Sequence, residues 1–94
     1  MRHHILVKFA DSATDLSQMR GRAEEIFAPV MDIPGVHGYS VHMSSVDRPN
    51  RYDLMVVIHM DEDALPRYDA SPCHKRWKDE LGPLFQQKAI FDCD

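Results

Sequence analysis

The sequence predicts an α+β fold in which helices cover one face of a four-stranded antiparallel sheet. Two observations lead to this prediction. Segments with strand-like and helix-like hydrophobic spacing follow one another in the order strand, helix, strand, strand, helix, strand, and the segment 52–60 is apolar on both faces. A chain of 94 residues can bury one modest core. We therefore expect a single domain over residues 1–94.

The first half of the chain carries signals for a strand, a helix and a second strand. Polar and apolar residues alternate over His3–Phe9, as in a half-buried strand. Capping residues at 11–14 precede apolar positions at helical spacing, which continue to about Met31. The turn signal Ile33–Gly35 then leads into a more polar strand, Val36–Ser44. Four residues of that strand are expected to share one face: His37, Tyr39, Val41 and Met43.

The segment Tyr52–Met60 predicts a strand that is buried on both faces. Even-numbered residues project one way at period two, while Met55 and Val57 project the other way. So short a chain can cover one face of its sheet with its own helices, and the second face needs another cover. A second copy of the chain, related by closed two-fold symmetry, would supply it. We therefore expect a homodimer with Met55 and Val57 at or near the interface.

The second half repeats the pattern after a polar loop at 45–51. Acidic residues at 61–63 cap a short helix that tolerates Pro66 in its first turn, and Ser71 with Pro72 restarts helix as cap and first position. Residues 87–93 form the last strand. The expected inward side of the second helix consists of His74, Trp77, Leu81 and Leu84. This order of elements is the split βαβ pattern of the ferredoxin-like fold.

Composition argues against several classes of function. The formal net charge is -4 and the basic residues are scattered, so we expect no nucleic-acid partner. No apolar run approaches the roughly 20 residues that span a bilayer, and Met1 leads directly into a strand rather than a signal peptide, so we expect a cytoplasmic protein without a membrane partner. Cys73 and Cys93 are expected to stay reduced, with Cys73 a bystander thiol.

Several segments in order resemble one protein family. They are residues 3–11 (HHILVKFAD), the turn 33–36 (IPGV), Tyr52-Asp53, Tyr68 followed by 71–74 (SPCH), and Phe91-Asp92. Together they resemble the Dabb family, the stress-responsive dimeric α/β-barrel domain, over residues 3–92. The resemblance implies ferredoxin-like homodimers whose two sheets pack into a barrel. That family includes a plant stress protein and the polyketide cyclase that makes olivetolic acid, while most bacterial members have no assigned chemistry.

The same resemblance implies a site. It would make His74 the general base and Tyr68 the hydroxyl that binds a carbonyl oxygen. A neutral imidazole can exchange a proton near pH 7, so each histidine is a candidate acid or base. The resemblance would make His3 a polar group that lines the pocket, and we expect Ile5 and Trp77 to bind the substrate as well. The alternative is that His74 packs against Trp77 and hydrogen-bonds backbone at the helix start. Many relatives have a histidine where this chain has Ser71, which we interpret as a helix cap.

The histidines do not predict a metal site. His3 and His4 are consecutive in a strand, so their side chains face opposite sides of the sheet. Cys73 and His74 are adjacent on a helix, so their side chains also point in different directions, and neither pair has the spacing to bind one metal ion. His42 and His59 could meet across neighbouring strands, yet no carboxylate accompanies them. We expect neither a metal nor a cofactor.

Hypotheses from different functional classes remain open. The chain could be a cofactor-free cyclase, lyase or isomerase that uses His74 and Tyr68 on a carbonyl compound in an apolar pocket. It could bind a small apolar or aromatic ligand without changing it, or serve as a structural stress-response dimer. A cofactor-independent monooxygenase of the dimeric α/β-barrel superfamily is a further alternative.

Overall fold

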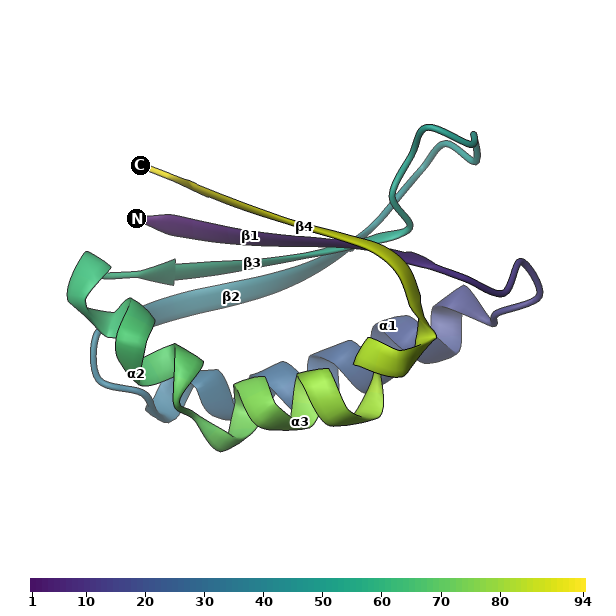
Figure 1. Cartoon of the computed structure of the whole chain (residues 1–94). Helices are drawn as coiled ribbons and strands as arrows, with labels where there is room; N and C mark the ends of the chain where they lie inside the picture. Colours follow the sequence, from purple (N-terminus) through teal and green to yellow (C-terminus); the bar gives the residue numbers. More distant parts are fainter.

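The computed structural model describes residues 1–94 and has two layers, with all helices beneath one face of the sheet (Figure 1). The strands are β1 (Arg2–Phe9), β2 (Val36–Met43), β3 (Leu54–Met60) and β4 (Phe85–Cys93), and the helices are α1 (Leu16–Phe27), α2 (Leu65–Asp69) and α3 (Pro72–Glu80). The strand order is β2-β3-β1-β4, with every neighbouring pair antiparallel. This topology confirms the predicted ferredoxin-like α+β fold. None of the helices combines the length and apolar character needed to cross a bilayer.

Local capping explains where the two longer helices begin. The Asp15 carboxylate accepts a hydrogen bond from the backbone N–H of Gln18 at the start of α1, so the cap lies one residue beyond the predicted 11–14 segment. At the start of α3, the Ser71 hydroxyl accepts from the backbone N–H of His74 at 3.2 Å and donates to the Tyr68 carbonyl at 2.6 Å. The predicted capping role of Ser71 is confirmed, and the same hydroxyl ties α3 to the end of α2.

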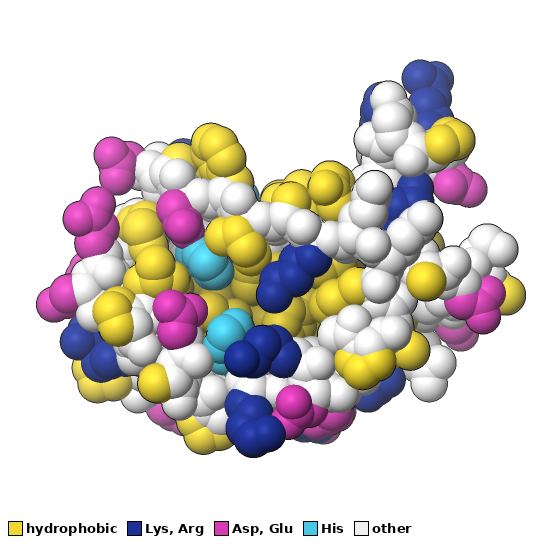
Figure 2. All heavy atoms as spheres, in the orientation of Figure 1, with side chains coloured by type: hydrophobic (Ala, Val, Ile, Leu, Met, Phe, Trp, Pro, Cys, Tyr) yellow, Lys and Arg dark blue, Asp and Glu magenta, His cyan; other side chains and the backbone are white.

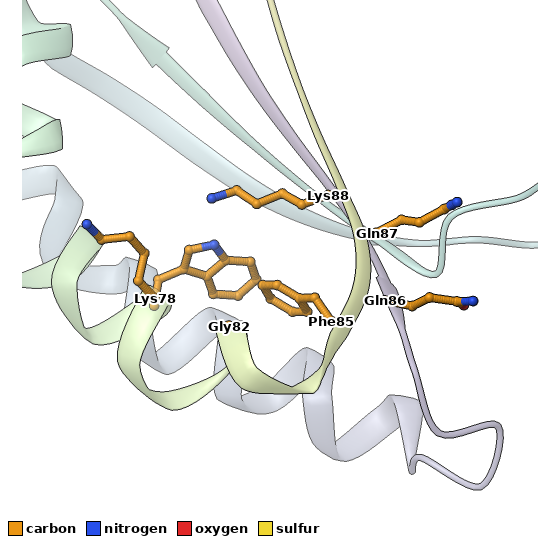
Figure 3. Close-up of a pocket in the computed structure, with 7 residues that line it drawn as sticks. Lys78, Gly82, Phe85, Gln86, Gln87 and Lys88 are labelled. Atoms are coloured by element: carbon orange, nitrogen blue, oxygen red, sulfur yellow. The ribbon is translucent and has the colours of Figure 1, made fainter.

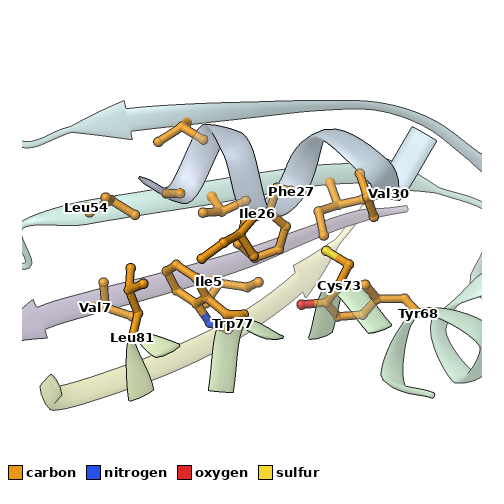
Figure 4. Packing of buried hydrophobic residues seen from close by; sticks show 14 of the residues in the cluster. Ile5, Val7, Ile26, Phe27, Val30, Leu54, Tyr68, Cys73, Trp77 and Leu81 are labelled. Atoms are coloured by element: carbon orange, nitrogen blue, oxygen red, sulfur yellow. The ribbon is translucent and has the colours of Figure 1, made fainter. Parts of the chain in front are cut away.

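The core lies between the sheet and the helices (Figure 4). Alternate residues of β1 and β3, among them Ile5 and Val56, point down into it and are almost fully buried. Trp77 of α3 is completely buried at its centre, with its ring centroid 4.9 Å from that of Phe27 and 5.2 Å from that of Phe85. Burying an aromatic side chain of this size contributes about 3 kcal/mol or more to stability.

The opposite side of the sheet, which we call the outer face, has no helix over it (Figure 1). Met55 and Val57 project there, as predicted, beside Leu6 of β1, which pairs with Met55. Phe91 of β4, opposite His4 of β1, is on the same face and 63% exposed. The outer face is therefore an apolar surface without a cover from its own chain.

Three details differ from the sequence prediction. Leu84 is 40% exposed rather than inward, because α3 ends at Glu80 and Leu84 belongs to a separate turn of 3₁₀ helix, Gly82–Leu84. His37 is exposed, because the β2–β3 register shifts between Val36 and Gly38 and turns it away from the other three residues. Finally, His42 pairs with Met55 and His59 with Gly38, so the two histidines do not meet across the strands.

Candidate functional site

Three rings gather where β1 passes over the junction of α2 and α3. The ring centroid of Tyr68 lies 5.5 Å from that of His3 and 5.0 Å from that of His74. The tyrosine ring thus packs against two imidazoles, one from β1 and one from α3. The structure brings together the three polar residues that the family resemblance implied.

His3 is oriented by a carboxylate from the neighbouring strand. It lies opposite Asp92 in the β1–β4 ladder, and its Nδ1 is 2.5 Å from Asp92 Oδ1. His3 is only 5% exposed. A carboxylate accepts and does not donate, so Nδ1 carries the proton and Nε2 of the neutral ring is left with its lone pair. The sequence patterns did not predict this pair.

His74 is oriented by the backbone. Its Nδ1 lies 2.8 Å from the carbonyl oxygen of Asp69, which can only accept, so this nitrogen carries the proton. The Nε2 atom makes no hydrogen bond within the chain and is the basic nitrogen of the neutral ring. The backbone bond agrees with the packing alternative, while a free Nε2 on a ring that packs against Tyr68 agrees with the catalytic one.

Tyr68 presents a buried hydroxyl without a partner. The residue is 1% exposed, and its hydroxyl makes no hydrogen bond. Burial raises the pKa of Tyr68 above its usual value, with additional increases from Cys73 and Asp69, so the hydroxyl keeps its proton and is a hydrogen-bond donor. An unsatisfied buried group of this kind costs about 1–3 kcal/mol. Burial also raises the pKa of Cys73 to about 11, which keeps its thiol protonated and unreactive.

A hollow between the sheet and the helices extends away from these rings. Figure 2 shows hydrophobic side chains at its floor, histidines at one end, and Lys or Arg side chains reaching over it from both margins. We call His3, Tyr68, His74 and Asp92 the histidine end. Further along α3 and β4 lies a pocket of about 250 Å³, shown in Figure 3, whose lining residues are Trp77, Lys78, Gly82, Phe85, Gln86, Gln87 and Lys88.

We call this pocket the lysine end. It is lined by an aromatic wall and by two cationic side chains. Trp77 and Phe85 form the wall, and Lys78 and Lys88 extend to the same side of it (Figure 3). The indole N–H of Trp77 is buried and makes no hydrogen bond. Sequence reasoning identified Trp77 but missed the lysines, because they come from two elements whose proximity depends on the fold.

The remaining geometry limits what the site can hold. Ile5 is 1% exposed and belongs to the core beneath the site. The pockets of the single chain are lined by neither the histidine pair nor Tyr68. No group of three or more His, Cys, Asp or Glu side chains is placed to hold a metal ion. The chemistry that the site's own residues can supply is hydrogen bonding and proton transfer.

Known structures share this fold over almost the whole chain. A dimeric ferredoxin-like protein of unknown function from Thermobifida fusca superposes with a TM-score of 0.76 and 22% identity, covering 96% of this chain and 85% of the other. A Dabb family protein with a ferredoxin-like fold from Mesorhizobium loti gives 0.73 and 20%, covering 99% and 93%. The hydroxynitrile lyase from Passiflora edulis gives 0.71 and 12%, covering 96% and 87%.

These likenesses establish the fold. No protein-family model matches the chain, and no curated protein is significantly similar to it in sequence. A Dabb family protein is among the structures that share the fold, which agrees with the family resemblance of the sequence. The same fold carries a lyase in one case and proteins of unknown function in others, so the fold alone does not determine the chemistry.

Proposed function

We propose that the chain forms a homodimer of the Dabb type that binds a small apolar carbonyl compound and transfers a proton on it without a cofactor. One observation carries the chemical part of this proposal. The ring of Tyr68 packs against two imidazoles, each of which is held with Nε2 free, and its buried hydroxyl has no partner.

The dimer part rests on the uncovered outer face. Its apolar residues include Leu6, Met55 and Val57, with the exposed Phe91 at the β4 edge. Fold neighbours from Thermobifida fusca and Bacteroides fragilis are described as dimeric. Two such sheets packed face to face would bury both apolar surfaces and form a barrel between the protomers.

Light scattering at low micromolar concentration tests the dimer. The wild-type protein should give about twice the chain mass of 10.9 kDa. Met55→Lys would place a charge in the interface and should yield a monomer, since desolvating an unpaired charge costs several kcal/mol. Met31→Lys is the matched control, because Met31 is 45% exposed in the helical layer. A well-folded wild-type monomer would contradict the dimer.

The chemistry follows from the hydrogen-bonding roles. Nε2 of His74 would accept a proton from the carbon next to a carbonyl, so that the C–H bond breaks and an N–H bond forms. The electron pair moves onto the carbonyl oxygen, where the Tyr68 hydroxyl, which keeps its proton, donates a hydrogen bond. The imidazolium then returns the proton to carbon or to a leaving group. That sequence serves a cyclase, lyase or isomerase alike.

Deuterium exchange tests this chemistry without knowledge of the natural substrate. Acetophenone, phenylacetone and methyl levulinate would be incubated with the protein in D₂O near neutral pH, and loss of the α-proton signals followed by NMR. The protein should accelerate exchange of at least one probe over buffer, and Tyr68→Phe should slow it. Exchange at the buffer rate for every probe would contradict proton transfer.

A binding protein without chemistry is the second candidate, and one observation favours it. Tyr68 is 1% exposed, so in the single chain its hydroxyl is closed to solvent. Ligand binding that persists unchanged in His74→Gln, with no exchange in either protein, would support this alternative.

A further inference from the structure

We infer that the lysine end binds a carboxylate, so that the ligand of this protein is a small organic acid with an apolar body. This inference deepens the proposed function, since it names the class of compound that would reach the histidine end. It is carried by two unpaired cations, a buried donor without a partner and an apolar wall, all around one pocket.

The two lysines are free to hold an anion. Other cations of the helical layer are paired: Lys75 with Asp79, and Arg76 with Glu25 and Glu80. Lys78 and Lys88 form neither an ion pair nor a hydrogen bond, and Figure 3 shows their side chains extending to the same side of the pocket. In a chain of net charge -4, this is a local concentration of positive charge beside an apolar wall.

The third group is the Trp77 indole. Trp77 is completely buried and lines the pocket, and its N–H makes no hydrogen bond. An acceptor oxygen in the pocket would satisfy that donor, whereas an apolar ligand would leave it unpaired. The partly exposed ring of Phe85, whose centroid lies 5.2 Å from that of Trp77, offers a surface for the apolar body.

A carboxylate suits this donor set better than a phosphate. The lining includes no arginine, which would hold a phosphate in bidentate fashion. The pocket, at about 250 Å³, is small and suits a compact acid. Phosphate sites also recruit runs of backbone N–H groups, but here the wall is aromatic.

The fold sets the distance between the acid and the reacting carbon. His74 and Lys78 lie four residues apart in α3, on one face and about 6 Å apart along the axis. On β4, the inward residues Lys88, Ile90 and Asp92 pair with Val7, Ile5 and His3, so the strand joins the same two ends. A short keto acid could therefore place its carboxylate at the lysine end and its carbonyl near Tyr68.

Direct binding tests the inference separately from any activity. Trp77 is the only tryptophan, so its indole N–H gives a single assignable NMR signal. The probes are phenylacetate and hexanoate, their uncharged counterparts phenylacetamide and hexanamide, and inorganic phosphate. Both the indole shift and the tryptophan fluorescence would be followed during titration of the protein.

At least one of the two acids should move the indole signal at millimolar concentration or below, with about tenfold tighter binding than its amide and with affinity that falls as salt is added. Lys78→Gln and Lys88→Gln should each weaken that binding about five- to tenfold. Lys75→Gln is the matched control, because Lys75 lies on the same helix but is paired with Asp79. It should bind like the wild-type protein. Melting curves would establish that the variants are folded.

Three results would overturn the carboxylate site: amides that bind as well as the acids, phosphate that binds as well as the acids, or lysine variants that behave like Lys75→Gln. The absence of an indole shift with both acids would do the same. If carboxylates bind as expected but no probe exchanges its α-protons, the site stands and the proposed proton transfer fails. If exchange occurs without carboxylate binding, the proposed proton transfer stands and the carboxylate site fails.

Discussion

The two ends of the hollow use their polar groups in opposite ways. At the histidine end, His3 and His74 are each fixed through Nδ1, by Asp92 and by the Asp69 carbonyl. At the lysine end, Lys78 and Lys88 have no partner, and their side chains extend beside the pocket (Figure 3). Fixed groups suit proton transfer, which depends on geometry, whereas long unpaired cations suit capture of an anion. Substitutions at the histidine end should therefore lower the rate of proton transfer, whereas substitutions at the lysine end should weaken ligand binding.

His74→Gln should produce the largest change at the histidine end. We expect the rate of α-proton exchange to fall by about two to four orders of magnitude, because glutamine cannot accept the proton. Glutamine can still donate to the Asp69 carbonyl, so the melting temperature should stay nearly constant. Exchange kinetics and thermal melts on the same preparation measure both quantities.

His37→Gln is the control for that substitution, because His37 is exposed and bonded only to Asp61. It should leave exchange unchanged. If His74→Gln instead lowers the melting temperature and leaves exchange per folded molecule intact, His74 is a packing and capping residue and the catalytic assignment is wrong.

Tyr68→Phe should separate activity from stability. Removing the hydroxyl should slow exchange by roughly tenfold to a hundredfold, because the developing oxyanion loses its donor. It should also stabilise the fold by about 1 kcal/mol, since the hydroxyl is buried without a partner. Chemical denaturation measures the second effect, with Tyr39→Phe as the matched control. A destabilised Tyr68→Phe would show that the hydroxyl has a partner in the native protein.

Cys73, the neighbour of His74 in α3, makes the stability of the protein depend on pH. Burial raises the pKa of this thiol from 9.0 to about 11 in the folded chain. Below pH 9 its contribution to stability is complete, and as the pH rises toward 11 the thiol ionises in the unfolded chain first. Stability should therefore fall by about 2 kcal/mol over that interval. Tyr68, whose pKa is also raised, should add a loss of the same sign above pH 10.

Urea titrations at several pH values measure the Cys73 effect. Cys73→Ala should flatten the pH dependence between pH 9 and 11, even though the lost volume lowers stability throughout. Cys93→Ala on β4 is the matched control and should keep the wild-type slope. Equal slopes for the wild-type protein and Cys73→Ala would contradict a buried, protonated thiol.

Sequence patterns predicted the fold well. At the histidine end and the lysine end, they predicted some of the residues but not how those residues pair. Strand and helix periodicity identified every main element, and Met55 and Val57 indicated an uncovered sheet face, because these signals are local. The pair His3–Asp92 was missed, since it depends on which strand becomes the neighbour of β1. Lys78 and Lys88 were missed for the same reason: nothing local to α3 or β4 shows that the two side chains meet over one pocket.

Lys88→Gln should produce the smallest change and the one that separates the ends most cleanly. Levulinate is the keto acid that corresponds to methyl levulinate. Lys88 holds the ligand equally well before and during proton transfer, so its loss should raise KM for α-proton exchange of levulinate about five- to tenfold without changing kcat. Methyl levulinate carries no charge, and its exchange should be unaffected. Lys75→Gln should change neither. If Lys88→Gln lowers kcat for both compounds, the lysine acts on the reacting carbonyl, and the division between a binding end and a proton-transfer end is wrong.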